Sequence, residues 1–177
     1  MIKRLLLAWG LLGVLAGWTK LDRDPHNLQP IINAMQFDGV ETTVSWEDCG
    51  QINAYYWPLK KHVYLCNELE GLPDGLIQFI LAHELAHGVI YQRQIPITGS
   101  KEAAADELAA YIMHAMGRDR EMLEAATWYA VMNTPEFPPD DHPSDIRRAW
   151  ALMRLADGTS EYSRRVTWTW NYLLELP

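Results

Sequence analysis

Residues 73–89 read PDGLIQFILAHELAHGV, and this stretch decides how the middle of the chain folds. Its apolar residues recur at the i, i+3, i+4 spacing that is typical of an amphipathic helix. Pro73 and Asp74 predict where the helix begins, with Asp74 as its cap. On such a helix the imidazoles of His83 and His87 lie one above the other, because a spacing of four residues returns to the same face.

Two imidazoles at this spacing can each give a nitrogen to one divalent metal, with Glu84 beside the metal as a general base. A catalytic zinc usually takes three protein ligands and leaves one position for water. The best third ligand is Glu102, on a second predicted helix from about Lys101 to Met116. Asp106 lies one turn further on, where it is expected to hold a ring N–H of one histidine. The alternative is that both carboxylates are ordinary solvated charges.

The two cysteines, Cys49 and Cys66, flank a segment rich in aromatic and β-branched residues. This composition predicts two strands joined by a turn at residues 58–61. Because the ends of a hairpin come close together, the cysteines are expected to form a disulfide in an oxidising compartment. The alternative is a pair of free thiols in the core.

The N-terminus has the pattern of a targeting segment. Lys3 and Arg4 precede an apolar stretch, residues 5–18, which is shorter than the roughly 20 residues that span a bilayer as a helix. Small residues near Ala16 fit cleavage by a signal peptidase. We therefore expect a signal peptide over residues 1–17, a single domain over 18–177, and an exported protein that is periplasmic or secreted. The alternative is an uncleaved membrane anchor.

Length and charge exclude several classes of protein. The chain has 177 residues, enough for one domain with a real core and too few to expect two. Its formal charge is -8, with no block of lysine and arginine beyond the N-terminus. The clustered positive charge that is typical of nucleic-acid-binding proteins is therefore missing, and no nucleic acid partner is expected.

The predicted elements come in the order strands then helices, which favours an α+β fold over a parallel α/β sheet. Before the cysteine hairpin we expect a short helix near residues 31–35 and a strand over 40–46. After the Glu102 helix we expect a helix over about 120–132, a proline-rich loop, and helical periodicity again from Ser144. Rings that alternate near the C-terminus are compatible with a strand: Tyr162, Trp168, Trp170 and Tyr172.

These motifs together resemble a bacterial family catalogued only as putative metallopeptidases, within a domain of unknown function. Its pattern is CGxxNAxYxP, LCxE, HExxH and ExxxD, and the chain carries all four between Cys49 and Asp106. HELAH with a downstream ExxxD also looks like the gluzincin class of zinc peptidases. The resemblance implies a zincin-like fold, in which a small antiparallel or mixed sheet with the cysteine-linked hairpin packs on the HExxH helix. It further implies one zinc per chain, held by His83, His87 and Glu102, with Asp106 supporting a histidine ligand.

The resemblance also suggests how a substrate binds. Asn53, Ala54 and Tyr55 are similar to an edge strand against which an extended peptide lies, a sequence-tolerant mode of binding. The HPxxxxR stretch from His142 to Arg148 is distantly similar to one in the prenyl-protein and heat-shock membrane protease branch. We expect His142 or Arg148 to donate to the carbonyl oxygen on which charge develops. The chain lacks the multiple spanning helices of that branch, so its intramembrane substrates are not carried over.

The sequence therefore predicts an exported zinc metallopeptidase, a hydrolase that cuts peptide or protein substrates with Glu84 as general base. One alternative is an exported zinc-binding module that does not turn over substrate. Another is a cytosolic zinc peptidase of the kind that cleaves repressors, although the export signal and the cysteine pair argue against it.

Overall fold

The computed structural model of the chain describes residues 21–37, 39–132 and 143–175. Three strands precede most of the helices along the chain, so the predicted α+β class is confirmed. Two short 3-10 turns, Pro58–Lys60 and Asn67–Gly71, flank β3. The elements are α2 (Gln29–Ala34), β1 (Thr43–Glu47), β2 (Ala54–Trp57), β3 (His62–Cys66), α3 (Asp74–Gln92), α4 (Lys101–Ala115), α5 (Asp119–Met132), α6 (Asp145–Ala156) and α7 (Glu161–Glu175).

The sheet is small and mixed, as predicted. Its strand order is β1-β3-β2, with β1 parallel to β3 and β2 antiparallel to β3. The predicted hairpin is present, and Tyr55 lies opposite Tyr64 in its register. Lys61 closes the turn between the two strands with a left-handed backbone, φ 49°. Since β3 is central, β2 is an edge strand of the described sheet.

The cysteine pair forms the predicted disulfide, which joins Cys49 beyond the end of β1 to Cys66 at the end of β3. The bridge closes a loop over a sequence separation of 17 that contains the whole β2–β3 hairpin. In the chain-entropy account, a disulfide destabilises the unfolded state because it reduces the number of conformations that the unfolded loop can adopt.

We expect the double substitution Cys49→Ala/Cys66→Ala to lower the free energy of unfolding by about 3 kcal/mol, the loss calculated for a loop of this length. Urea unfolding of the oxidised wild type and of the variant measures the difference. The wild type kept in reductant is the matched control, because it loses the bridge without losing either side chain. An unchanged midpoint in both samples would contradict a stabilising role for the bridge.

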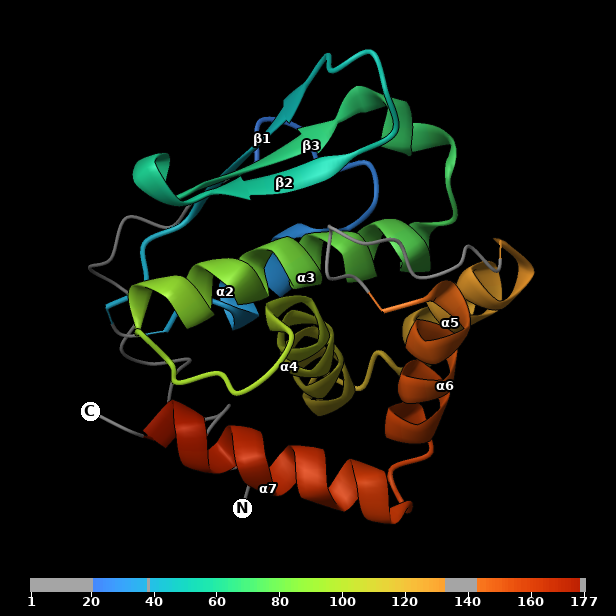
Figure 1. The fold of residues 1–177 in the computed structure, drawn as a ribbon. Coiled ribbons are helices and arrows are strands. Elements are labelled where there is room, and N and C mark those ends of the chain that lie inside the picture. The colour runs from blue at the N-terminus through green and yellow to red at the C-terminus, as the bar shows by residue number, and fades with distance from the viewer. Residues whose placement is uncertain (1–20, 38, 133–142, 176–177) are drawn as a thin grey trace.

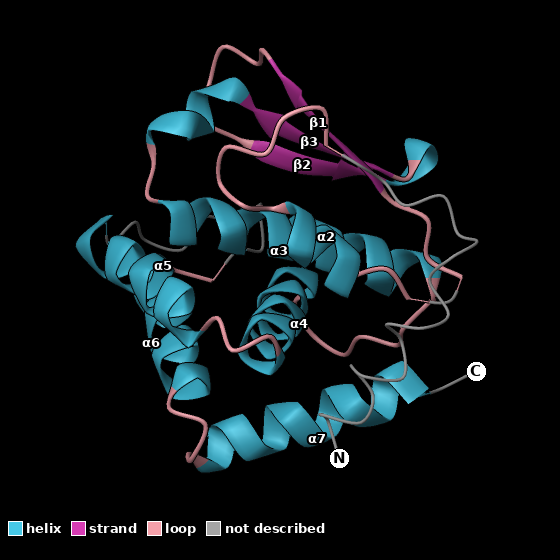
Figure 2. Cartoon of the chain, turned by 180° about the vertical axis from the view of Figure 1, so that it is seen from behind, coloured by secondary structure: helices cyan, strands magenta, loops and turns pink. Residues whose placement is uncertain are grey.

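Helix α3 runs through the centre of the molecule. The sheet lies on one side of it and α4 on the other, while α7 lies beyond α4 (Figure 1). Seen from behind, α2 lies across α3 (Figure 2), and the two helices are in contact. Thirteen of the 19 residues of α3 are buried. The predicted helix is therefore confirmed, but it is enclosed on most of its circumference rather than on one face, as a helix that is apolar nearly all round must be.

Gly88 sets how closely the sheet approaches α3. A Cβ atom at this position would lie 3.0 Å from Thr42 Oγ1 and 3.2 Å from Tyr56 Cε2. Such contacts are tighter than ordinary van der Waals distances, so a larger residue would push the ring of Tyr56, and with it β2, away from the helix. The absence of a side chain directly after His87 therefore keeps the edge strand near the histidines.

Two local expectations were wrong. Asp74 is the first residue of α3 rather than its cap, and its carboxylate accepts a hydrogen bond from His26 Nδ1 at 2.7 Å. The aromatic C-terminal segment is a helix, α7, rather than a strand. Its buried positions are Ser163, Val166 and Trp170, which follow the helical spacing. The rings of Trp168 and Tyr172 are exposed, whereas Tyr162 packs partly buried against the core.

The predicted signal peptide over residues 1–17 and the alternative anchor over 5–18 lie outside the described residues. Among the residues that the structure describes, no helix has both the length and the apolar character needed to cross a bilayer.

Candidate metal centre

Three potential ligand atoms meet between α3 and α4. His83 Nε2 lies 3.0 Å from His87 Nε2, and each of these nitrogens lies 3.1 Å from Glu102 Oε2. The two imidazoles come from successive turns of α3, and their rings meet edge to face. The structure therefore brings together the three residues that the sequence singled out as ligands.

The start of α4 explains how Glu102 reaches this position. Ser100 caps the helix, since its hydroxyl accepts a hydrogen bond from the backbone N–H of Ala103 at 3.1 Å. Glu102 consequently lies in the first turn, and the alanines that follow it allow α4 to lie close against α3. Buried small residues at Ala105 and Ala109 continue this close contact.

The chemistry of these atoms fits a divalent metal. His83 Nδ1 lies 2.8 Å from Asp106 Oδ1, so its N–H donates to the carboxylate and Nε2 is directed toward His87 and Glu102. Ligand atoms about 2.0–2.1 Å from a tetrahedral zinc ion lie about 3.3–3.4 Å from one another. The observed separations are close to this value, and two imidazole nitrogens with one carboxylate oxygen form a ligand set typical of catalytic zinc.

The electrostatics of the cluster also favour a cation. Burial alone would lower the pKa of His83, but the hydrogen bond to Asp106 and the nearby carboxylates outweigh it and raise the pKa to about 9. Burial would likewise raise the pKa of Glu102, yet its contacts with both histidines hold it well below the usual range. The carboxylates thus stabilise positive charge on the His83 imidazole, and a metal ion would replace that proton.

Asp106, which accepts a hydrogen bond from His83, is also bound by Arg148 of α6. The guanidinium donates from Nε to Oδ2 at 2.9 Å and from Nη2 to Oδ1 at 2.8 Å, and its Cζ lies 4.3 Å from the centre of the Tyr129 ring. Burial opposes the charged form of Asp106, but Arg148 and His83 lower its pKa to about 2. Arg148, predicted as a donor to a carbonyl oxygen, therefore has its guanidinium engaged with Asp106. His142 lies outside the described residues.

We expect Arg148→Met to lower the free energy of unfolding by about 3–5 kcal/mol, because it leaves the Asp106 carboxylate buried without its charged partner. The side chains of both residues are largely buried, so solvent screens this pair little. Denaturant unfolding measures the loss, and the neighbouring exposed Arg147→Met is the matched control. A loss equal to that of the control would mean that the pair contributes nothing.

Glu84 lies beside the three ligand atoms without joining them. Its Oε2 accepts a hydrogen bond from the backbone N–H of Tyr56 at 2.8 Å, and its Oε1 is 4.0 Å from His83 Nε2. Burial raises the pKa of the Glu84 carboxyl, although the nearby imidazoles oppose this. A carboxylate so placed suits a group that takes and returns a proton.

These residues open onto a cleft of about 970 Å³. Glu84, His87 and Glu102 line it, and one wall is formed by β2 and the residue before it, which include the predicted substrate strand Asn53, Ala54 and Tyr55. Most of the other lining residues come from the end of α3, the loop that follows it, the start of α4 and the β2–β3 turn. A group of these residues forms no periodic pattern or motif, so its place in the cleft could not be predicted from the sequence: Lys61, Ile90, Tyr91, Gln94, Ile95, Ile97 and Lys101.

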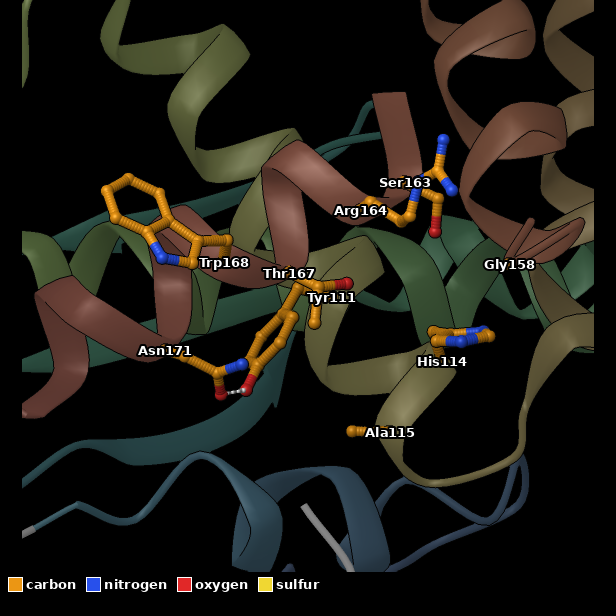
Figure 3. Close-up of a pocket in the computed structure, with 9 residues that line it drawn as sticks. All are labelled: Tyr111, His114, Ala115, Gly158, Ser163, Arg164, Thr167, Trp168 and Asn171. Carbon is orange, nitrogen blue, oxygen red and sulfur yellow. Dashed lines mark hydrogen bonds between the residues drawn. The ribbon is translucent and has the colours of Figure 1, made fainter. Parts of the chain in front are cut away.

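A second cavity, of about 360 Å³, lies between the end of α4, the turn before α7, and α7 (Figure 3). Some of the polar side chains that line it have hydrogen-bond partners. Tyr111 donates its hydroxyl to Asn171 Oδ1 at 2.6 Å, and His114 Nδ1 lies 2.6 Å from Asp119 Oδ1. None of the residues that line it belongs to the three-ligand cluster, so the chemistry described above is confined to the first cleft.

Comparison with known proteins agrees with this reading of the site. No curated protein and no solved structure matches the chain. A family model described as "Putative metallopeptidase" matches residues 74–174, more than half of the chain. The match begins at the first residue of α3 and includes HELAH and ExxxD, whereas the sheet and its disulfide precede it. The chain therefore belongs to this metallopeptidase family.

Proposed function

We propose that the chain is an exported, zinc-dependent endopeptidase of the gluzincin class, with one domain over residues 18–177. The observation that carries the proposal is the meeting of His83 Nε2, His87 Nε2 and Glu102 Oε2 beside Glu84 in a cleft. Membership of a metallopeptidase family supports peptide hydrolysis. The ligand set supports zinc as the metal.

Zinc held by His83, His87 and Glu102 would polarise the scissile carbonyl and lower the pKa of a bound water. Glu84 takes the proton of the attacking water and passes it to the leaving amine. Asp106 fixes the tautomer of His83, and Arg148 fixes the direction of Asp106. Since Arg148 is engaged in this way, we assign the predicted donation to the carbonyl oxygen to His142 alone.

The edge strand β2 suits the binding of an extended peptide. Asn53 accepts a backbone hydrogen bond from Cys66, so its carbonyl is directed toward β3. Backbone groups of successive strand residues point in opposite directions, and the N–H of Tyr56 accordingly donates to Glu84 on the cleft side. We propose that a substrate segment lies along Asn53, Ala54 and Tyr55 and adds a strand to the sheet.

Export is proposed from two features. The N-terminal segment has the composition of a signal peptide. The Cys49–Cys66 disulfide supports an oxidising compartment, because disulfides form and persist mainly outside the cytosol.

The test is to collect the protein from an exporting host, determine its N-terminus and bound metal by mass spectrometry, and incubate it with a peptide library. We expect a start near residue 18, one zinc per chain, and internal cleavage that stops when a chelator removes the metal. Zinc bound without any cleavage would favour a binding module, and a full-length cytosolic chain with reduced cysteines would overturn the assignment of compartment.

A further inference from the structure

We propose that the cleft selects peptides that carry an acidic side chain within about two residues of the scissile bond, next to an apolar side chain. The inference rests on the proposed peptidase function and adds the class of substrate to it. It is carried by two lysines that line the cleft, Lys61 and Lys101, and by apolar residues that line it as well.

The charge of the cleft differs from that of the rest of the protein. Lys61 and Lys101 balance Glu84 and Glu102 in formal charge. The two positive charges of a bound divalent ion then make the cleft net positive, within a chain whose formal charge is -8. A positively charged cleft has a positive electrostatic potential even in an acidic protein, and this potential favours the approach of anionic ligands.

Both lysines occupy positions where lysine is disfavoured, Lys61 through its backbone conformation and Lys101 through its charge. Lys61 has a left-handed backbone, φ 49°, which glycine or asparagine adopts more readily. Lys101 is the first residue of α4, where the positive end of the helix dipole repels a cation. Gln94, which also lines the cleft, has φ 51°. Lys61 and Gln94 thus have backbone conformations that cost free energy, and both line one cleft. Such conformations at one site indicate a role in binding.

The lysines reach the cleft from opposite sides of α3. Lys61 follows β2 on the sheet side and Lys101 begins α4 on the other side, with α3 between these elements (Figure 1). A peptide along β2 with its scissile bond near Glu84 passes Tyr56, whose N–H touches that carboxylate. A strand advances about 3.3 Å per residue. A substrate side chain about two positions from the scissile bond therefore comes within reach of Lys61, which lies just beyond the end of β2.

Neither lysine forms a strong ion pair with another residue that the structure describes. Lys61 Nζ lies 3.5 Å from Glu41 Oε2, but the Glu41 side chain is 86% exposed, and such surface pairs contribute little. Among the described residues, none forms an ion pair with Lys101. A substrate carboxylate held in the cleft, shielded from part of the solvent, would interact with either ammonium group more strongly.

Apolar residues from the end of α3 and the loop after it form part of one wall of the cleft. Ile90 and Ile95 are 8% exposed and Ile97 is partly buried, while Tyr91 is 55% exposed. A buried apolar surface beside an exposed ring can take up an apolar side chain of the substrate and remove it from water. The combination of this wall with two cations defines the preferred sequence as one apolar residue beside one acidic residue.

The experiment starts from a peptide that the zinc-loaded protein cleaves, made in three versions with Glu, Gln or Lys two positions from the scissile bond. We expect kcat/KM for the Glu version to exceed that for Gln by about fivefold to tenfold, and Lys to be poorest. The preference should shrink at high salt, because screening weakens charge pairing at a partly exposed site. In Lys61→Met/Lys101→Met the Glu version should lose its advantage.

Lys60→Met is the matched control. Lys60 is the neighbour of Lys61, but it does not line the cleft, and its ammonium group lies 3.2 Å from Tyr64 Oη and 4.4 Å from the centre of the Trp57 ring. This variant should keep the wild-type preference. Equal cleavage of the Glu and Gln versions by the wild type, or an unchanged preference in the double variant, would overturn the inference while the peptidase function stands. No cleavage of any peptide with zinc bound would overturn both.

Discussion

Glu84→Gln is expected to lower kcat/KM for peptide cleavage by about 10²–10⁴-fold while leaving zinc bound. The amide keeps the size of the side chain but cannot take a proton from water at neutral pH. Because Glu84 lies outside the three-ligand cluster, the substitution should not change the metal content. Steady-state kinetics on one cleaved peptide and metal analysis of the same sample measure the two quantities together.

Glu107→Gln provides the control for this experiment. Glu107 is another glutamate whose pKa is raised by burial, but its carboxylate accepts a hydrogen bond from Tyr162 away from the cleft. Its substitution should leave kcat/KM within about threefold of the wild type. If Glu84→Gln retained wild-type cleavage with zinc bound, Glu84 would not be the base.

Glu102→Ala is expected to weaken zinc binding by at least about 100-fold and to abolish cleavage. Loss of one of three protein ligands leaves only the two imidazoles, and even removal of a residue that merely supports a ligand costs about 10–100-fold in affinity. Competition with a coloured chelator measures the affinity of the purified protein. Peptide cleavage should disappear in the same variant.

Glu107→Ala, on the same helix, should retain wild-type zinc affinity and shows whether any change in α4 would have the same effect. Circular dichroism of Glu102→Ala separates loss of the ligand from loss of the fold. An unchanged zinc affinity in a folded Glu102→Ala protein would exclude Glu102 as the third ligand and require another donor.

Local patterns made much of the fold predictable. The spacing of apolar residues indicates α3, and the positions of His83 and His87 within it follow from helical geometry alone. The hairpin follows from β-branched and aromatic residues on both sides of Pro58. The parallel pairing of β1 with β3 follows from no such pattern, because it depends on how distant segments meet.

The surroundings of the cluster were harder to predict for the same reason. Arg148 can extend toward the cleft or toward Asp106, and only the docking of α6 decides between these directions. Ile95 and Ile97 form part of the cleft because the loop after α3 folds back, and nothing in their spacing indicates it. In α7, rings two positions apart suggested a strand, but burial of Val166 and Trp170 four positions apart outweighed that alternation.

The ion pair between Arg148 and Asp106 affects the order in which the site is completed during biosynthesis. The two residues are 42 positions apart, so a growing chain can present both histidines and Glu102 well before Arg148 has been added. Until α6 docks, the Asp106 carboxylate that accepts the hydrogen bond of His83 lacks the guanidinium that holds it in place. In the proposed zinc peptidase, the support behind His83 is therefore complete only after α6 has docked.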